Sequence, residues 1–325
     1  MKRNLSETRR RFLAFLAASQ VSLISVRSEA QPKQLELAWY SNHQTLGELF
    51  ADKVTELSLG EVKVALDGLP CLGVPLPTIA NLSDLASYNA PGFSSTEPVF
   101  GLSAVPMLVT TFGEAETLLR IARPYYSTAL ARHGQILLAT QPSRPGALWS
   151  TFSIRTLGDL TAIAFALQPH SSSGERGAWE RPFIRLGARL GSPFDAEAML
   201  SDGFIPSLMF TQNFISLMEL FFAVQLCFLT VSQQVFESLS EVQRQFLSAA
   251  GRETEIALWK GIGEDLRREH QDIVARGVLV TTQPPADVLA ALRTAAEPEI
   301  QRWAQSMGAD GANILAEYRR AIGRE

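Results

Sequence analysis

The chain has 325 residues, of which 46% are hydrophobic and 19% charged, and its formal net charge at pH 7 is −4. This hydrophobic content predicts a globular chain with real cores and excludes an intrinsically disordered one. The excess of acidic residues argues against nucleic acid and against anionic membrane surfaces as partners.

The first thirty residues have the organisation of an export signal. Basic residues open the chain, an apolar stretch covers about 12–24, and Ser28-Glu29-Ala30 follows as a small-x-small cleavage site. The pair Arg9-Arg10 before Phe12 matches the twin-arginine signal, with general secretion as the alternative route. A retained membrane anchor would need about 20 apolar residues. We therefore expect 1–30 to be a twin-arginine-like signal peptide and the mature chain to be periplasmic.

The remainder of the chain is long enough for two domains of ordinary size. The leader holds six basic and two acidic residues, so its removal makes the chain more acidic. An oxidising compartment would permit a bridge between Cys71 and Cys227. Cys227 lies in an apolar run, however, which favours an unbridged core thiol, and both interpretations stay open. Past the leader, the apolar stretch 214–229 is interrupted by Glu219 and is too short to span a membrane.

The mature chain opens with a strand, a helix and a strand. Residues 34–39 alternate polar and apolar like a strand, and 62–66 form the next one. Between them, Thr45 and Glu48 form a capping box that predicts a helix to about Leu57. This spacing is typical of a right-handed βαβ unit in a parallel sheet.

The same alternation of strands and helices continues to the C-terminus. Helices are expected near 78–87, over 114–133 with Gly134 as its stop, over 175–190, and in a tail that holds Trp303 and Tyr318. Strands are expected at 135–140, 163–167, 228–232 and 278–281. The pattern predicts an α/β protein.

One helix is expected to be unusually long. It begins with a second capping box, Ser240 to Gln243, and its periodicity continues to about Ala275. About 35 residues at 1.5 Å each make a helix of roughly 50 Å, which could brace two lobes. The alternative is two helices joined near Gly251 or Gly261, because glycine weakens a helix interior.

Six short motifs occur in an order that resembles a known family. They are Leu57-Ser58-Leu59-Gly60-Glu61-Val62, Leu72-Gly73, Val105-Pro106-Met107-Leu108, Leu148-Trp149-Ser150, Thr156-Leu157-Gly158-Asp159-Leu160, and Val231-Ser232-Gln233-Gln234 before Leu239-Ser240. In this order they resemble the extracytoplasmic solute-binding subunits of TRAP (tripartite ATP-independent periplasmic) transporters, the dicarboxylate-binding-protein-like family. The resemblance covers nearly all of the mature chain.

The resemblance implies a periplasmic-binding-protein-like fold with two α/β lobes, mostly parallel sheets, hinge strands and a long bracing helix. Lobe I would comprise 31–148 plus about 229–268, and lobe II 149–228 plus about 269–325. The family's proteins close over a small organic acid and deliver it to integral membrane permease subunits. The solute would lie in the cleft between the lobes, where parallel strands end.

The sequence departs from the family where the solute is bound. The family usually has a glycine after Asp-Leu and then an arginine that holds the solute carboxylate in a bidentate pair. Ala162 stands at the glycine position and Ala166 near the arginine position. Phe210 falls about where the family can have an asparagine. The solute is therefore expected to be an organic acid or a less charged relative.

Six residues are expected to bind the solute: His43, Arg144, Trp149, Gln168, His170 and Phe210. Arg144 is the best remaining candidate for anion recognition, with a solvated surface arginine as the alternative. Trp149 could be an aromatic wall of the cleft or could pack between the lobes. His43, Gln168 and His170 follow predicted strands, although a lone histidine is often a structural hydrogen-bonding residue.

No cofactor, metal site or catalytic site is expected. The histidines and cysteines lack metal-ligand spacing. Gly261-Ile262-Gly263 lies inside a helix, unlike a dinucleotide loop, and the run around Ser103 lacks the last glycine of a nucleophile elbow. The leading prediction is a solute-binding protein that is not an enzyme. An exported α/β hydrolase-like enzyme and a sensor-linked solute-binding protein are the alternatives.

Overall fold

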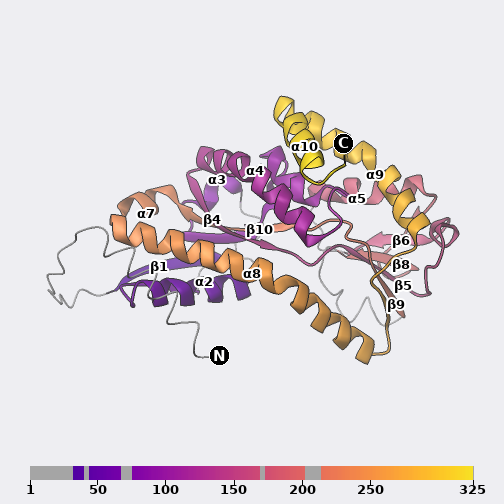
Figure 1. Ribbon diagram of the computed structural model, residues 1–325, viewed down its shortest axis with the longest axis horizontal. Helices are drawn as coiled ribbons and strands as arrows, with labels where there is room; N and C mark the ends of the chain where they lie inside the picture. The colour runs from indigo at the N-terminus through magenta and orange to yellow at the C-terminus, as the bar shows by residue number, and fades with distance from the viewer. Residues whose placement is uncertain (1–31, 40–43, 67–74, 169–172, 202–213, 325) are drawn as a thin grey trace. The chain divides into compact units, whose positions relative to one another are not determined.

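The computed structural model describes residues 32–39, 44–66, 75–168, 173–201 and 214–324 (Figure 1). Its strands are β1 (Lys33–Trp39), β2 (Val62–Ala65), β3 (Leu85–Asn89), β4 (Gln135–Pro142), β5 (Ala147–Ser150), β6 (Ala164–Leu167), β7 (Arg189–Leu190), β8 (Ala198–Ser201), β9 (Ser216–Glu219), β10 (Leu226–Ser232) and β11 (Leu279–Thr281). Its α-helices are α2 (Gln44–Leu57), α3 (Leu76–Ile79), α4 (Phe112–Arg132), α5 (Ser173–Arg185), α7 (Gln233–Ser238), α8 (Glu241–Ala275), α9 (Ala286–Met307) and α10 (Ala309–Ala321). Three 3₁₀ helices complete the set: η1 (Ala90–Phe93), η2 (Pro98–Ala104) and η3 (Leu157–Leu160).

The strands form two sheets, in the orders β2-β1-β3-β10-β4 and β11-β9-β5-β8-β6-β7. In each sheet one described strand runs against all the others, β10 in the first and β5 in the second. These two strands follow the segments that cross between the sheets, β4 to β5 and β9 to β10. A crossing strand enters its new sheet from the junction and is therefore reversed. The carboxyl ends of the remaining strands of both sheets consequently face that junction.

The central strands β3 and β10 of the first sheet are covered on both faces, which explains their apolar composition. Side chains of β1 and β10 pack with α2 and α8 on one face, around Phe50 and Leu247. On the other face Tyr88 and Phe228 pack with α4 and with the C-terminal helices. A strand that is buried on both faces does not alternate between polar and apolar residues.

The second sheet packs one face on α5 and α9. Phe165 and Leu167 of β6 lie there with Phe183, whose ring stacks on that of Phe165. The opposite face carries Trp149, which packs against Ile273 near the end of α8. Glu299 of α9 is buried and accepts hydrogen bonds from arginines of α5, which ties these two helices together.

The helix α8, orange in Figure 1, contacts α2 and β4 on the first sheet and β11 on the second. It is one continuous helix of 35 residues, and the side chains of Ser240 and Gln243 form its capping box. The long bracing helix is confirmed, and the alternative of two helices is not what the structure has. Both sheets, the two crossing segments and α8 confirm the predicted two-lobe α/β fold.

Several predicted elements need correction. The expected helix near 78–87 is wrong, because the observed helix α3 ends at Ile79 and β3 begins at Leu85. The helix expected over 175–190 ends at Arg185 and is followed by β7. Gln44 and Thr45 are both helical, so Thr45 lies inside the first turn of α2 instead of capping it. The lobe boundaries stay a prediction: α9 packs on the second sheet, whereas α10 contacts α4 beside the first.

Candidate functional site

The face of the second sheet that meets α8 carries the candidate site. Its strand register sets Ala166, Met199, Trp149 and Leu217 side by side across β6, β8, β5 and β9. Ser201, Ala147 and Glu219 form the next row toward the junction of the sheets. Neighbouring strands lie about 4.8 Å apart, so Ala166 is roughly 10 Å from Trp149 in the same row. The position where the resemblance implies an arginine therefore faces the same way as Trp149 and Glu219.

A small cavity lies between this face and the last turns of α8. Its volume is about 30 Å³, and it is lined by Arg144, Pro145, Ala147, Trp149, Ser201, Leu217, Glu219, Leu266, Glu269, His270 and Ile273. A water molecule needs roughly 10–15 Å³ by the same measure, so the cavity has room for about two. An organic solute is much larger, so a solute site would have to extend beyond this cavity.

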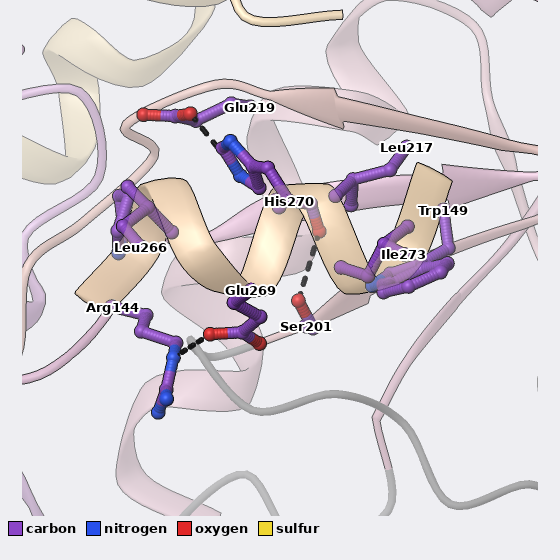
Figure 2. Close-up of a pocket in the computed structure, with 11 residues that line it drawn as sticks. Arg144, Trp149, Ser201, Leu217, Glu219, Leu266, Glu269, His270 and Ile273 are labelled. Carbon is purple, nitrogen blue, oxygen red and sulfur yellow. Dashed lines mark hydrogen bonds and ion pairs between the residues drawn. The ribbon is translucent and has the colours of Figure 1, made fainter. Parts of the chain in front are cut away.

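Two polar pairs close the cavity on the side of α8 (Figure 2). Nε2 of His270 lies 3.4 Å from Oε2 of Glu219, at the end of β9. The neighbouring Glu269 forms an ion pair with Arg144, in the segment between β4 and β5. Each pair joins α8 to one of the two segments that cross between the sheets. The hinge that the fold implies is therefore tied to the bracing helix by side-chain polar contacts.

Burial perturbs the ionisable groups of this cluster. Loss of hydration raises the pKa of Glu219 to about 7, since its side chain is only 8% exposed. Burial likewise lowers the pKa of His270. It lowers the pKa of Arg144 as well, against the opposing effect of the Asp265 carboxylate. Perturbed groups around a cavity are typical of functional sites, although structural ion pairs produce them too.

Three of the six predicted site residues can be placed. Arg144 and Trp149 line the cavity, and Trp149 is buried against Ile273. Gln168 is buried just past β6, where its backbone N–H donates to the Leu200 carbonyl oxygen at 3.0 Å. His43, His170 and Phe210 lie outside the described residues. Cys71 lies outside them as well, so the question of a bridge to Cys227, which is buried on β10, stays open.

Ser201, Glu219, Glu269 and His270 were not singled out as site residues from the sequence. Glu219 does have a signal in the sequence, since it is a charged residue within an apolar run. Glu269 and His270 have no such signal, because they lie in a strongly polar stretch of helix. Among the described residues, no group of three or more histidine, cysteine or acidic side chains could hold a metal ion. No helix of the described chain combines the length and apolar composition that crossing a membrane requires.

Comparison with solved structures decides the fold. A Bordetella pertussis extracytoplasmic solute receptor that binds pyroglutamic acid superposes with a TM-score of 0.71 at 19% identity, over 88% of this chain and 99% of that one. A TRAP periplasmic solute-binding protein from Ochrobactrum anthropi gives 0.76 at 19% identity, over 91% and 97%. One from Desulfovibrio desulfuricans, with bound sn-glycerol-3-phosphate, gives 0.72 at 13%, over 89% and 97%. This chain has the fold of the TRAP solute-binding proteins.

The sequence itself is far from these proteins. No family model matches it, and no curated protein matches it significantly. The shared property is the arrangement of two sheets, two crossing segments and a long helix, which the short motifs of the sequence predicted. One detail agrees with that resemblance. Ala162, where the family has glycine, has φ 61°, a left-handed conformation that favours glycine.

Proposed function

We propose that this chain is the solute-binding receptor of a TRAP-type transporter. It captures a small organic solute outside the cytoplasmic membrane and delivers it to integral membrane permease subunits. The observation that carries the proposal is the architecture: two sheets whose strands end at a common junction, joined by two crossing segments and α8. Ligands bind at such carboxyl edges in open α/β sheets, and the similar structures include receptors with bound organic acids.

The proposal includes export and the absence of catalysis. The basic start, the apolar stretch and Ser28-Glu29-Ala30 support cleavage of a signal peptide before Gln31. Intact-mass measurement of the exported protein checks the cleavage, and retained Met1 would contradict it. Replacement of Arg9 and Arg10 by lysine blocks export if the twin-arginine route is used.

The solute site we propose is the face of the second sheet that carries Ala166, Trp149 and Gln168, with Arg144 at its edge. Ala166 is 3% exposed and its neighbours in β6 are apolar, so this position offers a solute no cation. The apolar surroundings favour a solute with less negative charge than a dicarboxylate, because an unpaired buried carboxylate costs several kcal/mol. His43, His170 and Phe210 stay in the proposal as further contacts.

A thermal-shift screen of the purified protein against small organic acids, their amides and other polar metabolites tests the proposal. A receptor with a Kd of 1 μM gains about 4 kcal/mol of stability at 1 mM solute, which raises Tm measurably. The bound solute is then recovered and identified by mass spectrometry. Recovery of the unchanged solute supports a receptor. Conversion to a product supports the exported-enzyme alternative, and the absence of any stabilising solute argues against a solute receptor.

A further inference from the structure

The side chain of Arg144 already has a carboxylate partner. Its Nε forms an ion pair with Oε2 of Glu269, which points from α8 toward the segment between β4 and β5 (Figure 2). The Glu269 side chain is only 11% exposed, and the Arg144 side chain is 39% exposed. Partial burial strengthens such a pair relative to one on the open surface. The charge of Arg144 is therefore offset without any solute.

Further acidic groups surround this pair. Asp265 lies one turn before Glu269 on α8 and acts on Arg144 electrostatically, while it also pairs with Arg268. Glu219 lines the same cavity from β9, where it faces His270. Two carboxylates, Glu269 and Asp265, thus act on this cavity-lining arginine. A solute carboxylate brought here would have to displace Glu269 in the presence of Asp265.

The geometry points to Glu269 as the residue that sets the charge of the solute. This inference rests on the proposed receptor function. The Glu269 carboxylate pairs with Arg144 in the place that a solute carboxylate would take. The receptor therefore selects solutes that present a neutral polar group, such as an amide or hydroxyl, to this end of the sheet. Ala166, which removes the cation expected on β6, acts in the same direction.

The first comparison sets carboxylates against their amides on three proteins. Glu269→Gln keeps the size of the side chain and removes its charge, so Arg144 becomes available to an anion. Glu264→Gln makes the same chemical change at an exposed position of α8, where Glu264 pairs with Arg267. The probes are small monocarboxylates and the corresponding amides, including pyroglutamate and its amide. Binding is measured by calorimetry on the wild type and both variants.

We expect Glu269→Gln to bind at least one carboxylate about tenfold or more tightly than the wild type, a change of roughly 1.4 kcal/mol. Affinity for the amides stays within about twofold, and Glu264→Gln behaves like the wild type. The gain disappears when Arg144→Ala is added to Glu269→Gln. A merely structural role of Glu269 would weaken carboxylates and amides alike.

Two results would overturn the inference in distinguishable ways. If the wild type binds a neutral solute and Glu269→Gln gains no carboxylate, Glu269 does not set the solute's charge, and the receptor function stands. The inference fails in the same way if the gain survives Arg144→Ala. If no protein binds any probe or any solute of the wider screen, both the inference and the proposed function are wrong.

Discussion

Glu219, at the end of β9, lies next to His270 of α8. Burial disfavours the charge on each of them. Burial raises the pKa of Glu219 to about 7 and lowers that of His270. With one proton between them, the pair is either neutral or an ion pair, and the number of bound protons is the same in both states. The groups that face the pair around the cavity are Arg144, Glu269 and Ser201.

The contribution of Glu219 to stability should therefore fall as the pH rises through the acid-to-neutral range. The ordinary pKa of a glutamate carboxyl is 4.5, so between 4.5 and about 7 the folded state holds more protons at Glu219 than the unfolded state. Glu219→Gln removes this contribution and should make the protein about 1–3 kcal/mol less sensitive to the change from pH 5 to pH 8. The slope from His270 has the opposite sign, with stability lost as pH falls below 6.5, and it remains in the variant.

Denaturant unfolding of the wild type and Glu219→Gln at several pH values checks this expectation. Glu264→Gln is the matched control, because Glu264 is exposed and its pKa is lowered by the hydrogen bond from Arg267. Parallel stability curves for the wild type and Glu219→Gln would show that Glu219 ionises normally in the folded protein.

Ala162 offers a second prediction at the scale of one residue. Its φ of 61° strains an L side chain by about 1–2 kcal/mol. Glycine relieves that strain but adds about 0.4–1 kcal/mol of conformational entropy to the unfolded chain. Ala162→Gly should therefore stabilise the protein by roughly 0.5–1 kcal/mol, measured by denaturant unfolding. Ala164→Gly, in the extended backbone of β6, should destabilise it.

At the scale of elements, α8 depends on how closely it approaches β4. The register of β4 against β10 shifts at Leu229 and Thr230, which leaves Leu138 of β4 without an opposite residue. A Cβ on Gly251 would lie 2.5 Å from the Leu138 carbonyl oxygen. The glycine permits the contact. Nearby, the Glu255 carboxylate accepts the backbone N–H of Thr140, which is buried in β4, at 2.7 Å.

Gly251→Ala should consequently destabilise the protein by about 1–3 kcal/mol, because the helix must move off the strand. Gly263→Ala is the matched control, since nothing lies within 4 Å of the added Cβ. In a helix interior that change should stabilise the protein by up to about 1 kcal/mol. Thermal or denaturant unfolding of both variants measures the difference. Equal effects of the two substitutions would refute the close packing at Gly251.

Sequence patterns predicted elements well where one face of an element is polar or where a cap is explicit. The capping box at Ser240 and the stop before Gly277 located α8 within a residue. The strands β3, β5, β8 and β9 were not predicted, because they are short and buried on both faces, so their residues do not alternate. The glycines of α8 suggested a break, whereas Gly251 serves a contact that is distant in sequence.

The candidate site was predicted less completely than the fold, and for a physical reason. Arg144 and Trp149 stand next to motifs that the resemblance supplied. Glu269 and His270 acquire their environment only when α8 crosses the second sheet, whose cavity-lining strands β5, β8 and β9 are all distant from them along the chain. No local periodicity encodes that contact.

At the scale of the whole molecule, the proposed receptor function predicts closure on a solute. Besides α8, only the β4–β5 and β9–β10 segments carry the described chain from one sheet to the other. Side chains at this junction, including Arg144 with Glu269 and Glu219 with His270, can therefore respond to a change in the angle between the lobes. A solute that binds the closed arrangement better shifts the population toward it.

Small-angle scattering with and without a stabilising solute measures this closure. We expect a smaller radius of gyration in the presence of the solute, and no change with a metabolite that does not raise Tm. The proposed receptor function predicts that the solute is recovered chemically unchanged. An unchanged radius of gyration at saturating solute would contradict closure even if binding is tight, because a receptor that binds without moving gives a permease no bound state to recognise.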